Sequence, residues 1–310
     1  MIHSTMTKTS KTTMNSGINR PIVFFGTEDH SLLTLRALVE AGYTVVAVVT
    51  KQDTPKGRGK KLTPPAVKTY ATEHNIPVWQ PEKLTDMTND IKSLDEPVGI
   101  LVSFGRIIPK AILDLFTPGV INLHPSLLPI YRGPSPIESA IANRDNKTGV
   151  TIMKLVSEMD AGPIYIQVPY ALDFTETRHE LYNTLFTLGT NLLMRHLPAI
   201  VSGELTTTPQ DDSKATYCSL LSKDSNLLDL AKLTPGEAEA QIRAHIGFPR
   251  SRVVVGPYAI IVTKAHGVMD KKTPLDLKCA NGAFLSIDEV IAPSGKTMSS
   301  ADFLRGYQLS

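Results

Sequence analysis

The segment INLHPSLLPIYRG, residues 121–133, places two polar side chains at the end of an apolar run typical of a buried strand. Asn122 and His124 are two positions apart, so on a strand both side chains point to the same side. An asparagine amide donates hydrogen bonds, and a histidine donates or accepts one according to its protonation. Such a pair could stabilise negative charge on a carbonyl oxygen during acyl transfer. The alternatives are a turn-capping asparagine and a core histidine whose hydrogen bonds are satisfied.

Strands and helices are expected to alternate before this segment. PIVFFG (21–26) and YTVVAVVT (43–50) read as strands, and the helix expected between them ends at Gly42. This order implies parallel strands joined by right-handed crossovers, so the fold class is α/β with a Rossmann-like, mostly parallel sheet. Open parallel sheets bind ligands at the carboxyl ends of their strands, where Asn122 and His124 would lie. Further strands are expected at 76–80, 98–105 and 119–124, and helices at 31–42, 63–75, 109–116 and 135–144.

The pattern changes after Lys147. Two strands, 149–156 and 162–172, flank the loop SEMDAG, and an amphipathic helix over 176–203 follows them. A polar connection then leads to a helix at 234–246 and, from Val253 on, to short β-rich segments typical of a small barrel. We expect a disordered extension and two domains, with boundaries at 1–20, 21–207 and 208–310.

Composition and motifs exclude several classes of protein. The formal net charge is only +2, so a nucleic-acid contact would need a local basic patch. The two cysteines lack metal-ligand spacing and form no disulfide framework, which fits a reducing cytosol. Dinucleotide, P-loop, zinc-protease and nucleophile-elbow motifs are absent. The first twenty residues lack a secretory signal, and with Arg20 as their one arginine they support mitochondrial import only weakly, so we expect a cytoplasmic location.

The segment NLHPSLLPIYRGPSPIESAI resembles the signature of enzymes that transfer a formyl group from 10-formyltetrahydrofolate. In that family an Asn, a His and an Asp from a downstream D-x-G loop form the catalytic group. SEMDAGPIY supplies Asp160, 36 residues after His124. The resemblance therefore implies that Asn122, His124 and Asp160 are catalytic and that Ser126 and Arg132 hold the loop.

The same resemblance implies 10-formyltetrahydrofolate as the formyl donor and no metal. In the family the donor is received by the stretch SFGRIIP (103–109) and by the loop before Asp160, largely through backbone groups and apolar side chains. The residues expected to bind it are Ser103, Phe104, Gly105, Ile107, Ile108, Pro109, Ser126, Leu127, Leu128 and Pro129.

The stretch KQDTPKGRGKK, residues 51–61, holds five basic residues and one acid. It is similar to a basic loop in the branch of the family that formylates the methionyl amine of initiator tRNA. The resemblance implies charged initiator tRNA as the partner, an OB-like tRNA-binding domain over 208–310, and phosphate contacts from this loop. The alternative is a solvated run of charge. The residues expected to bind tRNA are Lys56, Arg58, Lys60 and Lys61.

The chain departs from this branch after the linker, where Leu230, Phe248 and Arg252 stand in stretches that usually read differently. Two alternative functions stay open: a formyltransferase for another amine, such as an amino-sugar nucleotide, and a non-catalytic RNA-binding module with the same fold. We expect a monomer without a membrane partner.

Overall fold

The structure is a computed structural model that describes residues 19–56, 59 and 61–309. The disordered extension expected over residues 1–20 therefore lies almost wholly outside the described residues. The chain divides into two compact units. The first runs up to Val120 and includes Met194–Leu205, and the second comprises Ile121–Leu193 and the chain from Thr206 onward. The expected domain boundary at 207/208 stays a prediction.

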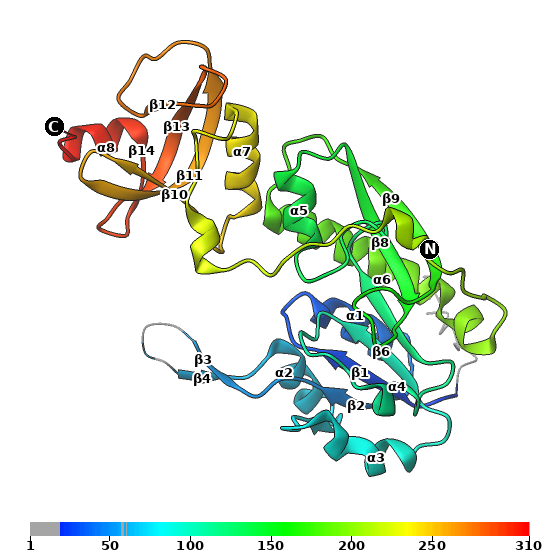
Figure 1. Cartoon of the computed structure of the whole chain (residues 1–310). Helices are drawn as coiled ribbons and strands as arrows, with labels where there is room; N and C mark the ends of the chain where they lie inside the picture. Colours follow the sequence, from blue (N-terminus) through cyan, green and yellow to red (C-terminus); the bar gives the residue numbers. More distant parts are fainter. Residues whose placement is uncertain (1–18, 57–58, 60, 310) are drawn as a thin grey trace, which may run out of the picture. The chain divides into compact units, whose positions relative to one another are not determined.

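The first unit holds the parallel strands that the sequence predicts (Figure 1). β1 pairs in parallel with β2 on one side and with β6 on the other, and β2 pairs with β5. All five residues of β1 and of β6 are buried, which fits strands that are covered on both faces. The strands are β1 (Ile22–Gly26), β2 (Val45–Val49), β5 (Val78–Trp79) and β6 (Val98–Val102).

The helices of this unit begin and end close to the predicted positions. Helix α1 ends at Glu40, and Gly42 follows it with a φ of +81°, a conformation that favours glycine. One expectation was wrong: residues 84–92, for which we predicted no element, form a 3-10 turn and a short helix. Leu84, Met87 and Ile91 have helical spacing and are the three buried side chains, so the signal is present but short and surrounded by polar residues. The helices are α1 (Ser31–Glu40), α2 (Ala66–Glu73), η1 (Leu84–Met87), α3 (Thr88–Lys92) and α4 (Lys110–Leu113).

The basic stretch is a β-hairpin rather than the loop that we expected. β3 (Thr54–Lys56) and β4 (Lys61–Thr63) pair antiparallel, with Lys56 opposite Lys61. Arg58 and Lys60 lie outside the described residues. The sequence did not predict these strands, because each has only three residues and their Lys and Pro content shows no alternation of apolar and polar side chains.

The second unit begins with β7 (Val120–His124), whose first residue belongs to the first unit. β7 pairs antiparallel with β8 (Lys147–Lys154), and β8 pairs antiparallel with β9 (Ile164–Ala171), as the hairpin pattern predicts. The strand order of the whole seven-stranded sheet is β5-β2-β1-β6-β7-β8-β9. Two helices accompany these strands, α5 (Pro136–Ala142) and α6 (Arg178–Ser202).

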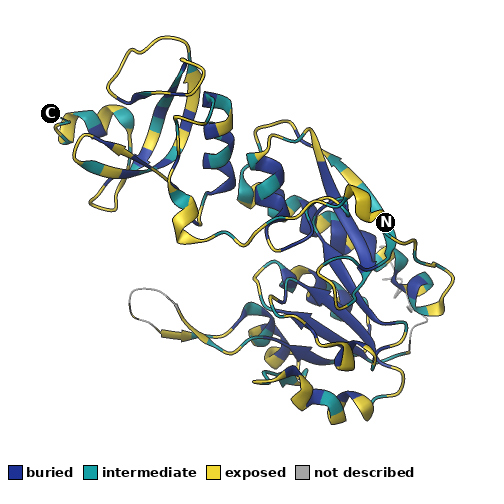
Figure 2. Ribbon diagram, in the orientation of Figure 1, coloured by how far each residue is buried: buried dark blue, intermediate teal, exposed yellow. Residues whose placement is uncertain are grey.

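The C-terminal part of the second unit is a small antiparallel β module. Its strand order is β10-β11-β13-β12, with β14 on β13, and its apolar side chains form one cluster with those of α7. Figure 2 shows buried residues on α7 and on the strands of this module. The small β domain is thus confirmed as an antiparallel sheet. Helix α8 is a correction, because we expected only β segments after Val253. The elements are η2 (Asp212–Lys214), η3 (Lys223–Asn226), α7 (Pro235–Ala244), β10 (Ser251–Val255), β11 (Tyr258–Val268), β12 (Asp276–Lys278), β13 (Phe284–Ile291), β14 (Thr297–Ser299) and α8 (Ser300–Gly306).

Candidate active site

Asn122 and His124 lie in the second half of β7, where the sequence predicts them. Each is only 5% exposed. Across the antiparallel pair, Asn122 stands opposite Met153 and His124 opposite Thr151 of β8. Residues two apart on a strand share a face, so both polar side chains leave β7 on the same side. Burying two polar groups together is costly unless they have a task or a partner.

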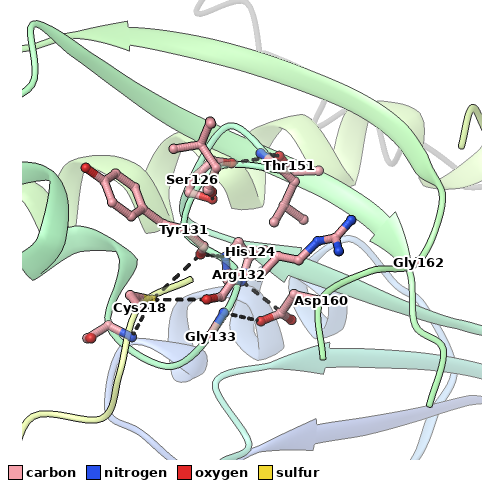
Figure 3. Close-up of polar contacts among 12 residues, drawn as sticks. His124, Ser126, Tyr131, Arg132, Gly133, Thr151, Asp160, Gly162 and Cys218 are labelled. Carbon is pink, nitrogen blue, oxygen red and sulfur yellow. Dashed lines mark hydrogen bonds and ion pairs between the residues drawn. The ribbon is translucent and has the colours of Figure 1, made fainter. Parts of the chain in front are cut away.

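The loop after β7 fixes the orientation of the His124 ring (Figure 3). His124 Nε2 donates to the Tyr131 carbonyl at 3.0 Å. A carbonyl oxygen can only accept, so Nε2 carries the proton of this bond, and Nδ1 is the nitrogen left for other contacts. Ser126 closes the same loop, because its hydroxyl donates to the Ile130 carbonyl at 2.6 Å. This agrees with the predicted loop-holding role of Ser126.

Asp160 approaches the free nitrogen of that ring (Figure 3). Its Oδ1 lies 3.7 Å from His124 Nδ1, and both side chains are largely buried. Its Oδ2 accepts a hydrogen bond from the Gly133 backbone N–H at 2.8 Å. The backbone of Asp160 has a φ of +48°, in the left-handed region where Asp is tolerated better than most residues. Asp160 and His124 thus form a pair at ion-pair distance.

Two glycines are required by close backbone approaches at this pair. A Cβ on Gly162 would lie 1.8 Å from the Lys154 carbonyl oxygen. A Cβ on Gly133 would lie 2.3 Å from the Cys218 carbonyl oxygen, and Gly133 also has a φ of +119°. The glycine of the D-x-G loop and the glycine after Arg132 are therefore steric necessities.

Arg132 is 3% exposed and turns away from His124. Its guanidinium donates to the Gln210 side-chain oxygen and to Asp212. The sequence analysis found neither partner, because both lie about 80 residues further along the chain and no local pattern marks them. The predicted loop-holding role of Arg132 agrees with these contacts.

The donor-binding residues predicted after β7 form a supported turn. Thr151 Oγ1 donates to the Ser126 carbonyl at 2.6 Å and accepts from the Leu128 N–H at 3.2 Å. Gln167 Nε2 donates to the Leu128 carbonyl at 2.8 Å. Leu128 is buried, whereas Leu127 and Pro129 are half-buried and offer apolar surface. Thr151 and Gln167 are further residues that the sequence analysis missed.

The other predicted donor-binding residues follow β6 in the first unit. Ser103 has a φ of +47°, and its hydroxyl lies 3.0 Å from His30 Nε2. Phe104 is 1% exposed and packs against Phe25, so only its backbone is available to a ligand. Ile107, by contrast, is 78% exposed. Of the other predicted donor-binding residues in this stretch, Gly105 and Pro109 are exposed, whereas Ile108 is buried.

Of the four predicted tRNA-binding residues, the structure places two. Lys56 ends β3 and Lys61 begins β4, directly opposite each other in register. Lys61 is exposed. The register thus sets two basic residues at one position of the hairpin, within a chain of low formal net charge.

Neighbouring titratable groups limit the chemistry of this site. Burial raises the pKa of the Cys218 thiol, which disfavours a thiolate nucleophile. Burial also raises the pKa of Tyr131 to about 12, so its hydroxyl stays protonated and donates to Asp145. The described part of the chain holds no group of three His, Cys, Asp or Glu side chains that could bind a metal. What the site offers is an amide, an imidazole and a carboxylate.

These groups suit acyl transfer without a covalent protein intermediate. An amide and an imidazolium can donate to an oxyanion, and a carboxylate can hold the imidazolium charged or accept a proton.

Among residues 19–56, 59 and 61–309, no helix has the length and apolar character needed to cross a membrane.

Comparisons with known proteins agree with this chemistry. The family model for formyl transferase matches residues 20–197. A methionyl-tRNA formyltransferase of Geobacillus sp. (strain WCH70) is 38% identical over 305 residues, which cover 92% of this chain and 94% of the relative. Another, of Sulfurihydrogenibium sp. (strain YO3AOP1), is 33% identical and covers 93% and 97%.

Solved structures share the fold at lower identity. An N-formyltransferase from Helicobacter canadensis, in complex with folinic acid and dTDP-3-aminofucose, has a TM-score of 0.68 at 18% identity, covering 87% of this chain and 99% of that one. HypX from Aquifex aeolicus, in complex with tetrahydrofolic acid, has a TM-score of 0.64 at 17% identity, covering 94% and 48%.

Proposed function

Since the chain belongs to the formyl transferase family, and within it to the methionyl-tRNA formyltransferases, we propose that it moves the formyl group of 10-formyltetrahydrofolate to the α-amine of methionyl-initiator tRNA. The observation that carries the proposal is the buried pair of His124 and Asp160, 3.7 Å apart and next to Asn122 on β7. This arrangement provides an oxyanion donor and a carboxylate in one place.

The formyl donor supplies an activated one-carbon group on nitrogen. During transfer to an amine, the formyl oxygen becomes negative, and Asn122 and His124 donate hydrogen bonds to it. Since His124 Nε2 already donates to the Tyr131 carbonyl, Nδ1–H of the protonated ring is the donor to the oxyanion. The Asp160 carboxylate lies 3.7 Å from the same Nδ1, so an anion stands beside this donor.

Asp160, or a water molecule that it orients, accepts the proton that the attacking amine releases. The new N–C bond forms on the methionyl amine, the N–C bond to the folate breaks, and a proton returns to the folate nitrogen, giving tetrahydrofolate. The roles of Asn122, His124 and Asp160 all belong to this proposal.

The folate would contact the exposed and half-buried members of the two predicted stretches. Ile107, Leu127 and Pro129 offer apolar surface, and Ser103 to Gly105 offer backbone groups at a strand end.

The tRNA phosphates would be contacted by the basic hairpin, through Lys56, Arg58, Lys60 and Lys61. We keep residues 21–207 as the catalytic domain and 208–310 as an OB-like tRNA-binding domain. A monomer in the cytoplasm is part of the same proposal.

Formyl transfer with a radiolabelled donor tests the function. Charged initiator tRNA should become labelled, whereas reactions with uncharged tRNA or without tRNA should not. A third reaction offers a nucleotide-linked amino sugar as the acceptor. Labelling of the sugar but not of the tRNA would replace this proposal with the amino-sugar function, and no labelling of either would leave a non-catalytic protein.

A further inference from the structure

The polar segment between α6 and α7, which we expected to be only a connection, is bonded to both loops of the candidate active site. Thr208 exchanges two backbone hydrogen bonds of 2.8 Å with Ile164, just after the Asp160 loop. Thr216 and Cys218 bracket Arg132, whose N–H donates to the Thr216 carbonyl and whose carbonyl accepts from Cys218, both at 2.8 Å. The segment therefore borders the Asp160 loop at one end and the His124 loop at the other.

Gln210 lies between these two attachment points and contacts both loops with one side chain. Its Nε2 donates to the carbonyls of Asp160 and Gly162, each at 2.7 Å. Its Oε1 accepts from Arg132 Nε at 3.1 Å and from Arg132 Nη2 at 2.8 Å. The amide orientation is fixed by these partners, since the reverse would set an oxygen against two carbonyls and an NH₂ against a guanidinium.

These contacts act on a part of the site whose backbone is strained. Asp160 is held in a left-handed backbone conformation that costs free energy for a non-glycine residue. Two of the three residues of the Asp-Ala-Gly turn are anchored through their carbonyls to the Gln210 amide. Arg132, on the other side of the amide, is next to Gly133, whose N–H donates to the Asp160 carboxylate. One amide thus sets the distance between the loop that carries Asp160 and the loop that holds it.

We propose that Gln210 is a positioning residue that holds the Asp160 carboxylate at its distance from His124. This inference rests on the proposed function, because it assigns a task to Gln210 in that reaction. The segment that leads to the C-terminal module is then a part of the catalytic centre. Gln210 itself does not contact the reacting atoms and acts through Asp160.

Gln210→Glu is the sharpest variant. It keeps an oxygen for Arg132 and nearly the same shape, but it removes both N–H donors and sets a carboxylate against two carbonyls. We expect kcat to fall by about tenfold to a hundredfold, as for a catalytic group displaced by about 1 Å, with little change in KM for either substrate. Gln210→Ala should show a similar loss. Asp211→Asn is the matched control, because the described contacts of Asp211 stay within its own segment.

A double-mutant comparison separates positioning from a general loss of stability. In an Asp160→Asn background, Gln210→Ala should cost almost nothing more in kcat, because the group it positions is already disabled. The inference would be overturned if Gln210→Ala lowered kcat by the same factor in the Asp160→Asn background as in the parent. It would also be overturned if both Gln210 variants kept the wild-type kcat. Hydrogen exchange over residues 157–163 gives a readout that needs no tRNA: it should rise in the Gln210 variants and not in Asp211→Asn. Failure of the parent protein to formylate tRNA would reject the proposed function. Hydrogen exchange over residues 157–163 that is the same in the Gln210 variants as in the parent would separately reject the role of Gln210.

Discussion

At the scale of single residues, the two nitrogens of His124 have different tasks. Nε2 is committed to the Tyr131 carbonyl, and Nδ1 faces Asp160. The ring therefore cannot rotate to exchange its nitrogens without losing a buried hydrogen bond, which typically costs about 1 kcal/mol or more. The Asp160 carboxylate is likewise divided, with one oxygen toward His124 and the other on the Gly133 N–H. Nδ1 thus carries both remaining contacts of the ring: it lies at ion-pair distance from Asp160, and it is the nitrogen left to donate to the formyl oxygen in the proposed reaction.

Asp160→Asn removes the negative charge and keeps the shape. The new side chain can still accept from Gly133 N–H, so we expect folding to be retained. The protonated form of His124 loses its counter-charge, and kcat should fall by about a hundredfold, comparable to the loss of an electrostatic contact in other active sites. Steady-state kinetics and a melting curve on one preparation measure both effects. Wild-type turnover in this variant would contradict the assigned role.

Asn122→Ala tests the oxyanion role. Asn122 lies inside β7 and not at a helix start, so loss of a cap, worth about 1 kcal/mol, is not the expected effect. We expect kcat to fall by about 10² to 10³, the range for removal of one oxyanion donor. If the melting temperature falls instead and kcat is spared, Asn122 serves the strand alone.

At the scale of elements, Asp160 lies in the turn between β8 and β9, and its position is set where the backbones on the two sides of this turn come close together. Gly162 comes so near the Lys154 carbonyl that no side chain fits, and Lys154 N–H donates to the Pro163 carbonyl across the same crossing at 2.9 Å. The hairpin thus narrows just after Asp160 and directs its side chain inward. The position of a catalytic group is here a property of two strands and not of one residue.

Gly162→Ala should damage both stability and catalysis, because the added methyl group must displace the Lys154 backbone. We expect a loss of about 1–3 kcal/mol in the free energy of unfolding, typical of overpacking, together with reduced kcat. Gly306→Ala is the control: nothing lies near its Cβ position, and the residue ends α8. A Gly162→Ala protein as stable and active as the control would show that the crossing is not tight.

Local sequence explains why the strands and the reactive residues could be predicted and why their supports could not. β7 begins with the apolar pair Val120 and Ile121 and then alternates polar and apolar side chains, and Asp160 follows a strand of clear pattern, so both carry local signals. Gln210 and Cys218 sit in a polar connection, 48 or more residues from their partners in the two loops. Their contacts depend on how the chain returns to the loops, which no periodicity encodes. The hairpin of Lys56 and Lys61 was missed because three-residue strands are too short to show alternation.

Helix α7 ends at Ala244, and His245, its C-cap residue, is buried with its Nδ1 3.5 Å from the Ser251 hydroxyl of β10. Burial, and then the nearby Arg178 guanidinium, lowers the pKa of His245. The unfolded state, with a histidine pKa of about 6.5, therefore binds more protons than the folded state as the pH falls below that value, and stability is lost. The loss develops between the unfolded pKa and the lower folded pKa.

His245→Gln should remove this acid sensitivity. Melting temperatures measured from about pH 7.5 to pH 5 should fall less steeply for the variant than for the parent. His179→Gln, at an exposed position of α6, controls for the loss of an imidazole. Parallel curves for the parent and His245→Gln would mean that His245 does not contribute to the pH dependence.

At the scale of the whole molecule, a chain with a formal charge of only +2 must concentrate its positive charge to bind a polyanion. In the register of the hairpin β3–β4, two basic residues, Lys56 and Lys61, are directly opposite each other. Its base is fixed, because Asp53 accepts from Lys68 Nζ at 2.8 Å and from Gln80 Nε2 at 3.0 Å. The hairpin is therefore a defined extension of the first unit.

Lys56→Ala with Lys61→Ala tests whether this hairpin binds the tRNA. Adjacent like charges destabilise a cross-strand pair slightly, so their presence is better explained by a ligand than by folding. We expect KM for charged tRNA to rise strongly while KM for the folate hardly changes. The slope of log affinity against log salt concentration should flatten by about two units, roughly one for each lost phosphate contact. Lys92→Ala with Lys110→Ala removes the same charge from two exposed positions that lie outside both the hairpin and residues 208–310. Because net charge acts on both double variants alike, only a difference between them locates the contact. Equal salt slopes in the two would show that the hairpin lysines are merely solvated, and the tRNA contact would then have to lie elsewhere on the chain.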